Sequence, residues 1–166
     1  MRVVIGLGSN VGRRLENLQG AIDTLFDAPG LEFVAVSSVY ETDPVGGPEQ
    51  GLFLNAVVIG ETTLDPRTLL DRALGVENAF GRVRAERWGP RTLDVDLITV
   101  DDVTMSDPEL TLPHPLAHER AFVLVPWVEA DPAAELPGRG SAAALLASLD
   151  QEGVRRRPDL TLRPPE

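Results

Sequence analysis

The chain of 166 residues contains no cysteine and no lysine. Without cysteine, disulfides, thiol catalysis and zinc–thiolate sites are excluded. Without lysine, a P-loop, a lysine clamp on phosphate and Schiff-base chemistry are excluded as well. All fifteen basic residues are therefore arginines, and any anion that the protein binds must be met by arginine, by histidine or by backbone N–H groups.

Long apolar runs are also missing, so no membrane span is expected. The first residues lack the pattern of a secretory leader, and a cytoplasmic location is the expectation. The formal net charge of −11 argues against broad binding to nucleic acid. The length is that of one domain able to bury a core, and we expect a single domain over residues 1–166 with a flexible, solvated tail at 154–166.

The most informative stretch runs from residue 81 to 98. Its second part alternates as a strand over residues 92–100, which places Leu93, Val95 and Leu97 on one face. Asp94 and Asp96 share the other face, roughly 6 to 7 Å apart along the chain. Two neighbouring carboxylates repel each other unless a cation lies between them. The alternative interpretation of this pair is an ordinary solvated strand face.

The first part of that stretch is a loop rich in arginine. Four arginines occur within ten residues, and Trp88 lies among them, beside Gly89 and Pro90. Such loops are commonly only solvated, but an exposed tryptophan is unusual unless it covers something. A divalent metal on the aspartates and a polyanion under the arginines would explain both parts, which points to a magnesium–nucleotide site. The arginines are Arg82, Arg84, Arg87 and Arg91.

Periodicity and turn residues predict the remaining elements. We expect a glycine turn capped by Ser9 or Asn10 and a helix capped by Asp65 that ends near Gly81. The Gly/Pro-rich loop over 43–51 is either a lid or binding loop or a flexible loop without a specific role. Strands are predicted at 3–7, 31–42, 53–62, 92–100 and 110–112, and helices at 11–26, 66–80, 121–129 and 141–149.

Four polar residues have both a structural and a functional interpretation. Asn55 interrupts an apolar strand and either satisfies backbone groups or binds a heterocycle. Glu77 is either a boundary residue that pairs with an arginine or a ligand contact at the helix end. His114 and His118 are spaced as metal ligands on a helix, but Pro115 makes a regular helix improbable. A phosphate or nucleotide contact is the favoured interpretation of the histidines.

Taken together, these motifs resemble the 6-hydroxymethyl-7,8-dihydropterin pyrophosphokinase family. The resemblance rests on G-L-G-S-N at 6–10, S-S-V-Y-E-T-D-P-V-G at 37–46, F-L-N-A-V at 53–57, R-W-G-P-R-T-L-D-V-D-L at 87–97 and L-P-H-P with E-R-A-F between 112 and 122. It implies an α+β, ferredoxin-like α/β plait with a central antiparallel sheet flanked by helices. It also implies transfer of pyrophosphate from ATP to the pterin hydroxyl in folate biosynthesis, with release of AMP.

The same resemblance implies roles for individual residues. Two Mg²⁺ ions would be held by Asp94 and Asp96, which with Arg82 and Arg91 form the implied catalytic set. ATP would contact Glu77, Arg82, Arg84, Arg91, His114 and Arg120. The pterin would contact Thr42, Pro44, Val45, Phe53, Asn55, Trp88, Asp94 and Phe122, with Trp88 as a covering residue.

Three departures from the family pattern are visible. Phe53 and Leu116 stand where tyrosines are common, which removes a hydroxyl contact to the pterin and affects one nucleotide contact. The arginine loop between Arg84 and Trp88 is one residue shorter than in some relatives. The rival interpretations are another D-x-D metal–nucleotide transferase and a binding protein of this fold that has lost catalysis. The expected partners are the two small-molecule substrates, with neither nucleic acid nor membrane, and the chain is expected to be a monomer.

Overall fold

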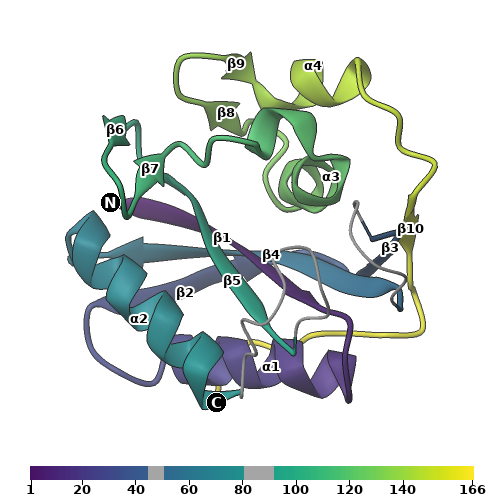
Figure 1. The fold of residues 1–166 in the computed structure, drawn as a ribbon, viewed down its shortest axis with the longest axis horizontal. Coiled ribbons are helices and arrows are strands. Elements are labelled where there is room, and N and C mark those ends of the chain that lie inside the picture. The colour runs from purple at the N-terminus through teal and green to yellow at the C-terminus, as the bar shows by residue number, and fades with distance from the viewer. Residues whose placement is uncertain (45–50, 81–91) are drawn as a thin grey trace.

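A six-stranded antiparallel sheet is the centre of the fold in the computed structural model, which describes residues 1–44, 51–80 and 92–166 (Figure 1). The strand order is β10-β3-β4-β1-β5, and β2 pairs with β4 beside β3. The strands of this sheet are β1 (Arg2–Ser9), β2 (Leu31–Val36), β3 (Tyr40–Thr42), β4 (Phe53–Thr62), β5 (Asp94–Val100) and β10 (Val154–Arg156).

Helices cover both faces of the sheet (Figure 1). One face carries α1 (Arg14–Leu25) and α2 (Pro66–Ala79), and the other carries α3 (Ala121–Ala130) and α4 (Ala142–Ala147). The short elements between them are β6 (Met105–Ser106), β7 (Thr111–Leu112), the 3₁₀ helix η1 (Ala117–Glu119), β8 (Glu135–Leu136) and β9 (Gly140–Ser141). The predicted α+β architecture with a central antiparallel sheet is confirmed.

Alternation along the strands gives the sheet two apolar faces. Leu54 and Val95 point to the α1/α2 side and join its core, whereas Val57 and Ile98 join the core beneath α3. Each large side chain in these layers is almost completely removed from water, and burial of apolar surface is the main force that holds the helices on the sheet. Among residues 1–44, 51–80 and 92–166, no helix combines the length and apolar composition needed to cross a bilayer.

Several predicted elements are confirmed in detail. The strand predicted at 53–62 is β4. Asp65 caps α2, because its side chain accepts a hydrogen bond from Thr68 N at 2.8 Å. Ser141 caps α4 in the same way by accepting from Ala144 N at 3.2 Å.

The strand predicted over 31–42 is wrong in its middle. It divides into β2 and β3, because Ser37 Oγ accepts from Val57 N at 2.9 Å and Ser38 N donates to Glu129 on α3 at 2.8 Å. These bonds turn the backbone away from the regular ladder. The carboxylate comes from a residue 91 positions away, so the local pattern of β-branched residues carried no sign of it.

The predicted start of the first helix is also wrong. Helix α1 begins at Arg14, and neither Ser9 nor Asn10 caps it. The side chain of Asn10 instead donates to Gly51 O at 3.2 Å, and Ser9 Oγ accepts from Asn17 Nδ2 at 3.2 Å. These polar side chains join the end of β1 to neighbouring loops, so strand β1 extends further than predicted.

The expected flexible tail at 154–166 is corrected by the structure. Residues 154–156 form β10, which pairs with β3 and extends the sheet. The chain then runs back beneath the sheet toward α1 (Figure 1), and Leu160 and Leu162 pack into the α1/α2 core. Gln19 exchanges two hydrogen bonds with the backbone of Arg163, so this segment is an integral part of the fold.

Candidate active site

The two aspartates of the D-x-D motif lie on the face of the sheet that α3 covers. Asp94 and Asp96 are half-buried and alternate with Val95 and Leu97, which point into the opposite core. The predicted face assignment is therefore confirmed. In the antiparallel register, Gly8 of β1 is opposite Asp94 and Gly6 is opposite Asp96.

Glycines of β1 lie opposite both aspartates. Gly8 separates Asn55 on β4 from Asp94 on β5, because it is the registered neighbour of both. The side chains of Asn55 and Phe53 lie over Gly8, since a Cβ there would be 2.6 Å from Asn55 Oδ1 and 3.6 Å from Phe53 Cδ2. Asn55 and Asp94 therefore stand on one face of the sheet two strand spacings apart, roughly 10 Å. Glycine inside a strand often marks such a close approach, and this is a site feature that the sequence reasoning missed.

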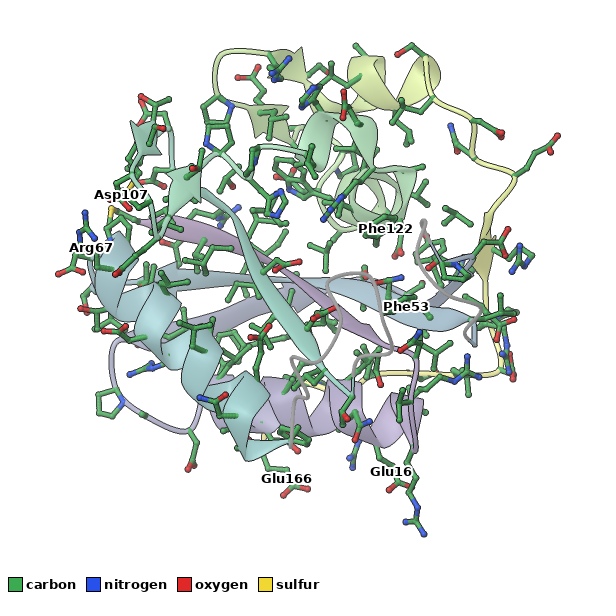
Figure 2. All side chains as sticks on the ribbon, in the orientation of Figure 1. Glu16, Phe53, Arg67, Asp107, Phe122 and Glu166 are labelled. Carbon is green, nitrogen blue, oxygen red and sulfur yellow. The ribbon has the colours of Figure 1, made fainter. Side chains whose placement is uncertain are left out.

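Residues on the β3–β4 side form an aromatic and amide-lined region. Asn55 is buried and donates to Thr42 Oγ1, so its amide orientation is fixed by the neighbouring strand. Phe53 on β4 and Phe122 on α3 are each half-buried and lie between the helix and the sheet (Figure 2). The structure thus brings together four of the residues predicted to contact the pterin, from three different elements.

His114 lies between the aspartates and this region. Its backbone N–H donates to Ile98 O at 2.9 Å, which anchors it to β5, and its Nδ1 accepts from Leu116 N at 3.2 Å. Burial lowers the pKa of His114, while the nearby Asp96 raises it and Arg120 lowers it. An imidazole with Nδ1 as acceptor and a lowered pKa is neutral at pH 7 and carries its proton on Nε2.

Arg120 connects two parts of the site. Its guanidinium carbon lies 5.4 Å from the ring centroid of Phe122, and its charge acts on His114. A guanidinium over an aromatic face is a cation–π contact. Arg120 is thus in contact with the aromatic region and electrostatically coupled to the histidine next to the aspartates.

Two cavities adjoin these residues. One, of about 370 Å³, is bounded by Thr42, Pro44, Arg120 and Phe122. Another, of about 790 Å³, lies between the β6–β7 and β8–β9 hairpins and is bounded by Thr111, His114 and Arg139, among others. Exposed Leu116, which stands where a tyrosine was expected, lines the first cavity. His114 therefore has one cavity beside it that is large enough for a nucleoside.

Glu77 does not face either cavity. Its side chain is buried to 3% exposure, and its Oε2 accepts from Val95 N at 2.8 Å. Val95 lies between the two aspartates on the edge strand of the sheet. Glu77 therefore fixes the backbone of the D-x-D strand to the end of α2.

Some predicted site residues fall outside the part of the chain that the structure describes. These are Val45, Arg82, Arg84, Trp88 and Arg91. Within the described residues, no group of three or more acidic, histidine or cysteine side chains is placed to hold a metal ion. His118 lies in η1, and its Nε2 is 3.7 Å from Glu119 Oε1.

Comparison with known proteins identifies the family. Residues 4–132 match the family described as 7,8-dihydro-6-hydroxymethylpterin-pyrophosphokinase. The 2-amino-4-hydroxy-6-hydroxymethyldihydropteridine pyrophosphokinase of Mycobacterium tuberculosis is 49% identical over 93% of this chain and 88% of its own length. The enzyme of the same name from Methylorubrum extorquens is 44% identical over 93% of this chain and 98% of its own.

Solved structures agree on the fold. The Plasmodium falciparum HPPK-DHPS A437G structure with SDX-DHP superimposes with a TM-score of 0.70 at 14% identity, over 88% of this chain. The chain spans 45% of that protein's length. Sequence and fold together define a pyrophosphokinase built on an antiparallel α+β sheet. The chain belongs to the 7,8-dihydro-6-hydroxymethylpterin-pyrophosphokinase family, whose members act in folate biosynthesis.

Proposed function

We propose that this chain transfers the β,γ-pyrophosphoryl group of ATP to the hydroxymethyl oxygen of 6-hydroxymethyl-7,8-dihydropterin. The pterin oxygen forms a bond to the β-phosphorus, and the bond between that phosphorus and the α,β-bridging oxygen breaks. AMP leaves with the bridging oxygen, and the hydroxyl proton is released. The observation that carries the proposal is the placement of Asn55 and Asp94 on one face of the sheet, on the two strands that flank Gly8.

The pterin is proposed to lie on this face of the sheet, against Asn55 and Phe53. Asn55 offers an amide donor and acceptor to the polar edge of the ring, and Thr42, which accepts from Asn55, holds that amide in place. Phe122 and Phe53 would stack on the flat ring from the helix and from the sheet. Pro44, Val45 and Trp88 complete the proposed contacts, with Trp88 covering the ring.

ATP is proposed to bind on the other side of His114. The cavity of about 790 Å³ next to His114 is supported as the nucleoside position by its size. A neutral His114 with its proton on Nε2 can donate to a phosphate oxygen, and Arg120 can contribute positive charge. Arg82, Arg84 and Arg91 are proposed to contact the phosphates, where they would neutralise charge in the transition state.

Two Mg²⁺ ions are proposed to be held by Asp94 and Asp96. The donor set fits, because both are carboxylates on one face and Mg²⁺ prefers carboxylate and phosphate oxygens with several waters retained. The metal would supply neutralisation of phosphate charge. Glu77 is proposed to act through β5 rather than through ATP, since its carboxylate is engaged by Val95 N.

The oligomeric state, location and partners of the protein are also proposed. We propose a cytoplasmic monomer that binds its two small substrates and neither nucleic acid nor a membrane. The net charge of −11 supports the absence of a nucleic-acid partner.

Product analysis tests the function. The protein is mixed with ATP, Mg²⁺ and 6-hydroxymethyl-7,8-dihydropterin, and AMP and ADP are separated, with a reaction lacking the pterin as control. AMP that depends on the pterin is the expected result. ADP would indicate transfer of a single phosphoryl group, and absence of a pterin-dependent product would favour a different D-x-D transferase or an inactive binding protein.

A further inference from the structure

The C-terminal segment holds the end of β3, where the proposed pterin contact Thr42 is located. Strand β10 pairs with β3 such that Val154 is opposite Thr42 and Arg155 is opposite Glu41. The backbone N–H of Asp43 donates to Gly153 O at 3.0 Å. Both chain neighbours of Thr42 are therefore in contact with residues more than a hundred positions later.

Side chains reinforce this backbone pairing through a three-residue network. Glu41 Oε2 accepts from Arg157 Nη1 at 2.9 Å and from Arg14 Nη1 at 3.3 Å. The same Nη1 of Arg14 donates to Leu52 O at 2.9 Å. Arg14 thus links the residue before Thr42 to the residue before Phe53, and Arg157 ties both to the C-terminal segment. We call Arg14, Glu41 and Arg157 the Glu41 triad.

The Glu41 triad is well placed to resist solvent screening. The side chains of Glu41, Arg14 and Arg157 are 18%, 29% and 32% exposed, and charged hydrogen bonds that are partly removed from water are stronger than exposed pairs. Arg157 is itself held by Asp159, which accepts from its Nε at 3.0 Å and from its Nη2 at 2.8 Å. The guanidinium is therefore oriented before it meets Glu41.

A second ion pair holds Asp43, the residue after Thr42. Arg155 Nη2 lies 3.0 Å from Asp43 Oδ1. Thr42 itself points to the opposite face and accepts from Asn55 Nδ2. Movement of β3 relative to β4 would therefore break the alignment of Thr42 with the Asn55 amide, which is proposed to hydrogen-bond the pterin.

We propose that the C-terminal segment 153–163 is a clamp that sets pterin affinity, with Glu41 and Arg157 as positioning residues for Thr42 and Asn55. The clamp is expected to affect pterin binding and not ATP binding, because its contacts reach β3 and the residue before β4. None of the described contacts of the triad involves His114, Asp94 or Asp96. This inference rests on the proposed function.

The test uses the full chain with Glu41→Gln and Arg157→Met. Each is expected to raise the KM for the pterin about fivefold to tenfold, while the KM for ATP changes less than twofold. Arg157→Lys retains the positive charge but lacks the planar guanidinium that bonds Glu41 and Asp159 together. It is expected to give a pterin KM between those of wild type and Arg157→Met. Pterin affinity is also measured by calorimetry with a nonhydrolysable ATP analogue present, which should show the same order.

A control separates positioning from a general loss of stability. Arg67→Met removes the Arg67–Asp107 pair, which lies at the far end of the sheet from Phe53 and Phe122 (Figure 2). This control is expected to lower the melting temperature, while the pterin KM stays within twofold of wild type.

The outcomes distinguish a clamp on the pterin site from a general stability effect and from failure of the proposed function. A pterin KM that is unchanged in Glu41→Gln and Arg157→Met, or an ATP KM that rises equally, overturns the clamp. A rise in Arg67→Met as large as that in Arg157→Met would show a stability effect and also overturn it. A wild-type protein that makes no pterin-dependent AMP overturns the proposed function and the clamp with it, whereas an active wild type with unshifted variants overturns the clamp alone.

Discussion

Glu77 Oε2 accepts a hydrogen bond from Val95 N at 2.8 Å, and Val95 stands between the two aspartates of the D-x-D strand. The edge of β5 would otherwise present this N–H without a partner from the sheet. A carboxylate on α2 thus determines the position of a strand that carries the proposed metal ligands. This bond joins α2 to β5, the helix before residues 81–91 and the strand after them.

Glu77→Ala should lower both stability and turnover. It leaves the buried Val95 N–H unpaired, which costs about 1–3 kcal/mol, and it loosens the strand that carries Asp94 and Asp96. Glu77→Gln is the matched control, because its amide oxygen can still accept from Val95 N. Chemical denaturation and kcat measure the two effects; an alanine variant with wild-type stability would contradict the role assigned to this bond.

Asp96→Ala should reduce kcat by at least about a hundredfold, which corresponds to roughly 2.7 kcal/mol of transition-state stabilisation. The reason is the loss of a carboxylate proposed to hold Mg²⁺. Asp102→Asn, in the exposed turn after the same strand, removes a charge without touching the site and should leave kcat within twofold. Near-normal turnover of Asp96→Ala at saturating Mg²⁺ would refute the metal assignment.

Gly8→Ala should weaken pterin binding by about tenfold. The new Cβ would lie 2.6 Å from Asn55 Oδ1, so the amide would have to move from the position in which it donates to Thr42. Gly75→Ala on α2 is a suitable control, because a Cβ there meets nothing within 4 Å. The pterin dissociation constant measured by calorimetry checks this, and equal affinity in wild type and Gly8→Ala would show that the position of the Asn55 amide does not determine pterin binding.

Tyr40 is the only tyrosine in the chain, so its ionisation can be followed by tyrosinate absorbance alone. Burial raises the pKa of Tyr40 to about 12, and its hydrogen bond to Glu129 adds to this. The unperturbed pKa is 10.0. Since the folded pKa is the higher one, the stability contributed by protonated Tyr40 is fully present below pH 10 and is lost as the pH rises toward 12.

The alkaline titration should therefore have its midpoint well above 10 in the folded protein and near 10 in denaturant. Glu129→Ala removes the 3.0 Å hydrogen bond and the adjacent charge, so its folded-state midpoint should be lower than that of wild type. A wild-type midpoint near 10 under folding conditions would mean that Tyr40 is neither buried nor bonded as described.

Local sequence patterns predicted those parts of the fold whose causes are local. The cap at Asp65 and the alternation along Phe53–Thr62 are properties of consecutive residues, and both elements formed as expected. The break after Val36 depends on Glu129, and the place of β10 depends on Glu41 and Asp43. Contacts between residues so far apart leave no periodic signal, so the strand break and the ordered C-terminal segment were not predicted.

The candidate site shows the same division. The alternation predicted correctly that Asp94 and Asp96 share a face, because strand geometry requires it. The resemblance to a family supplied the residues around them, and the structure brings Thr42, Asn55, Phe53 and Phe122 to one region. The burial of Glu77 against Val95 was not foreseen, because a helical position beside an apolar stripe gives no information on which backbone group an acid will meet.

Transfer of isotopic label from ATP to the pterin tests directly whether the pterin hydroxyl attacks the β-phosphorus. ATP labelled at the β-phosphorus and ATP labelled at the γ-phosphorus are each incubated with the protein, Mg²⁺ and 6-hydroxymethyl-7,8-dihydropterin, and the pterin product is isolated. If the pterin oxygen attacks the β-phosphorus, both labels appear in the pterin product in equal amounts, and unlabelled AMP is released. Appearance of the γ label without the β label would contradict attack on the β-phosphorus and, with it, the proposed reaction.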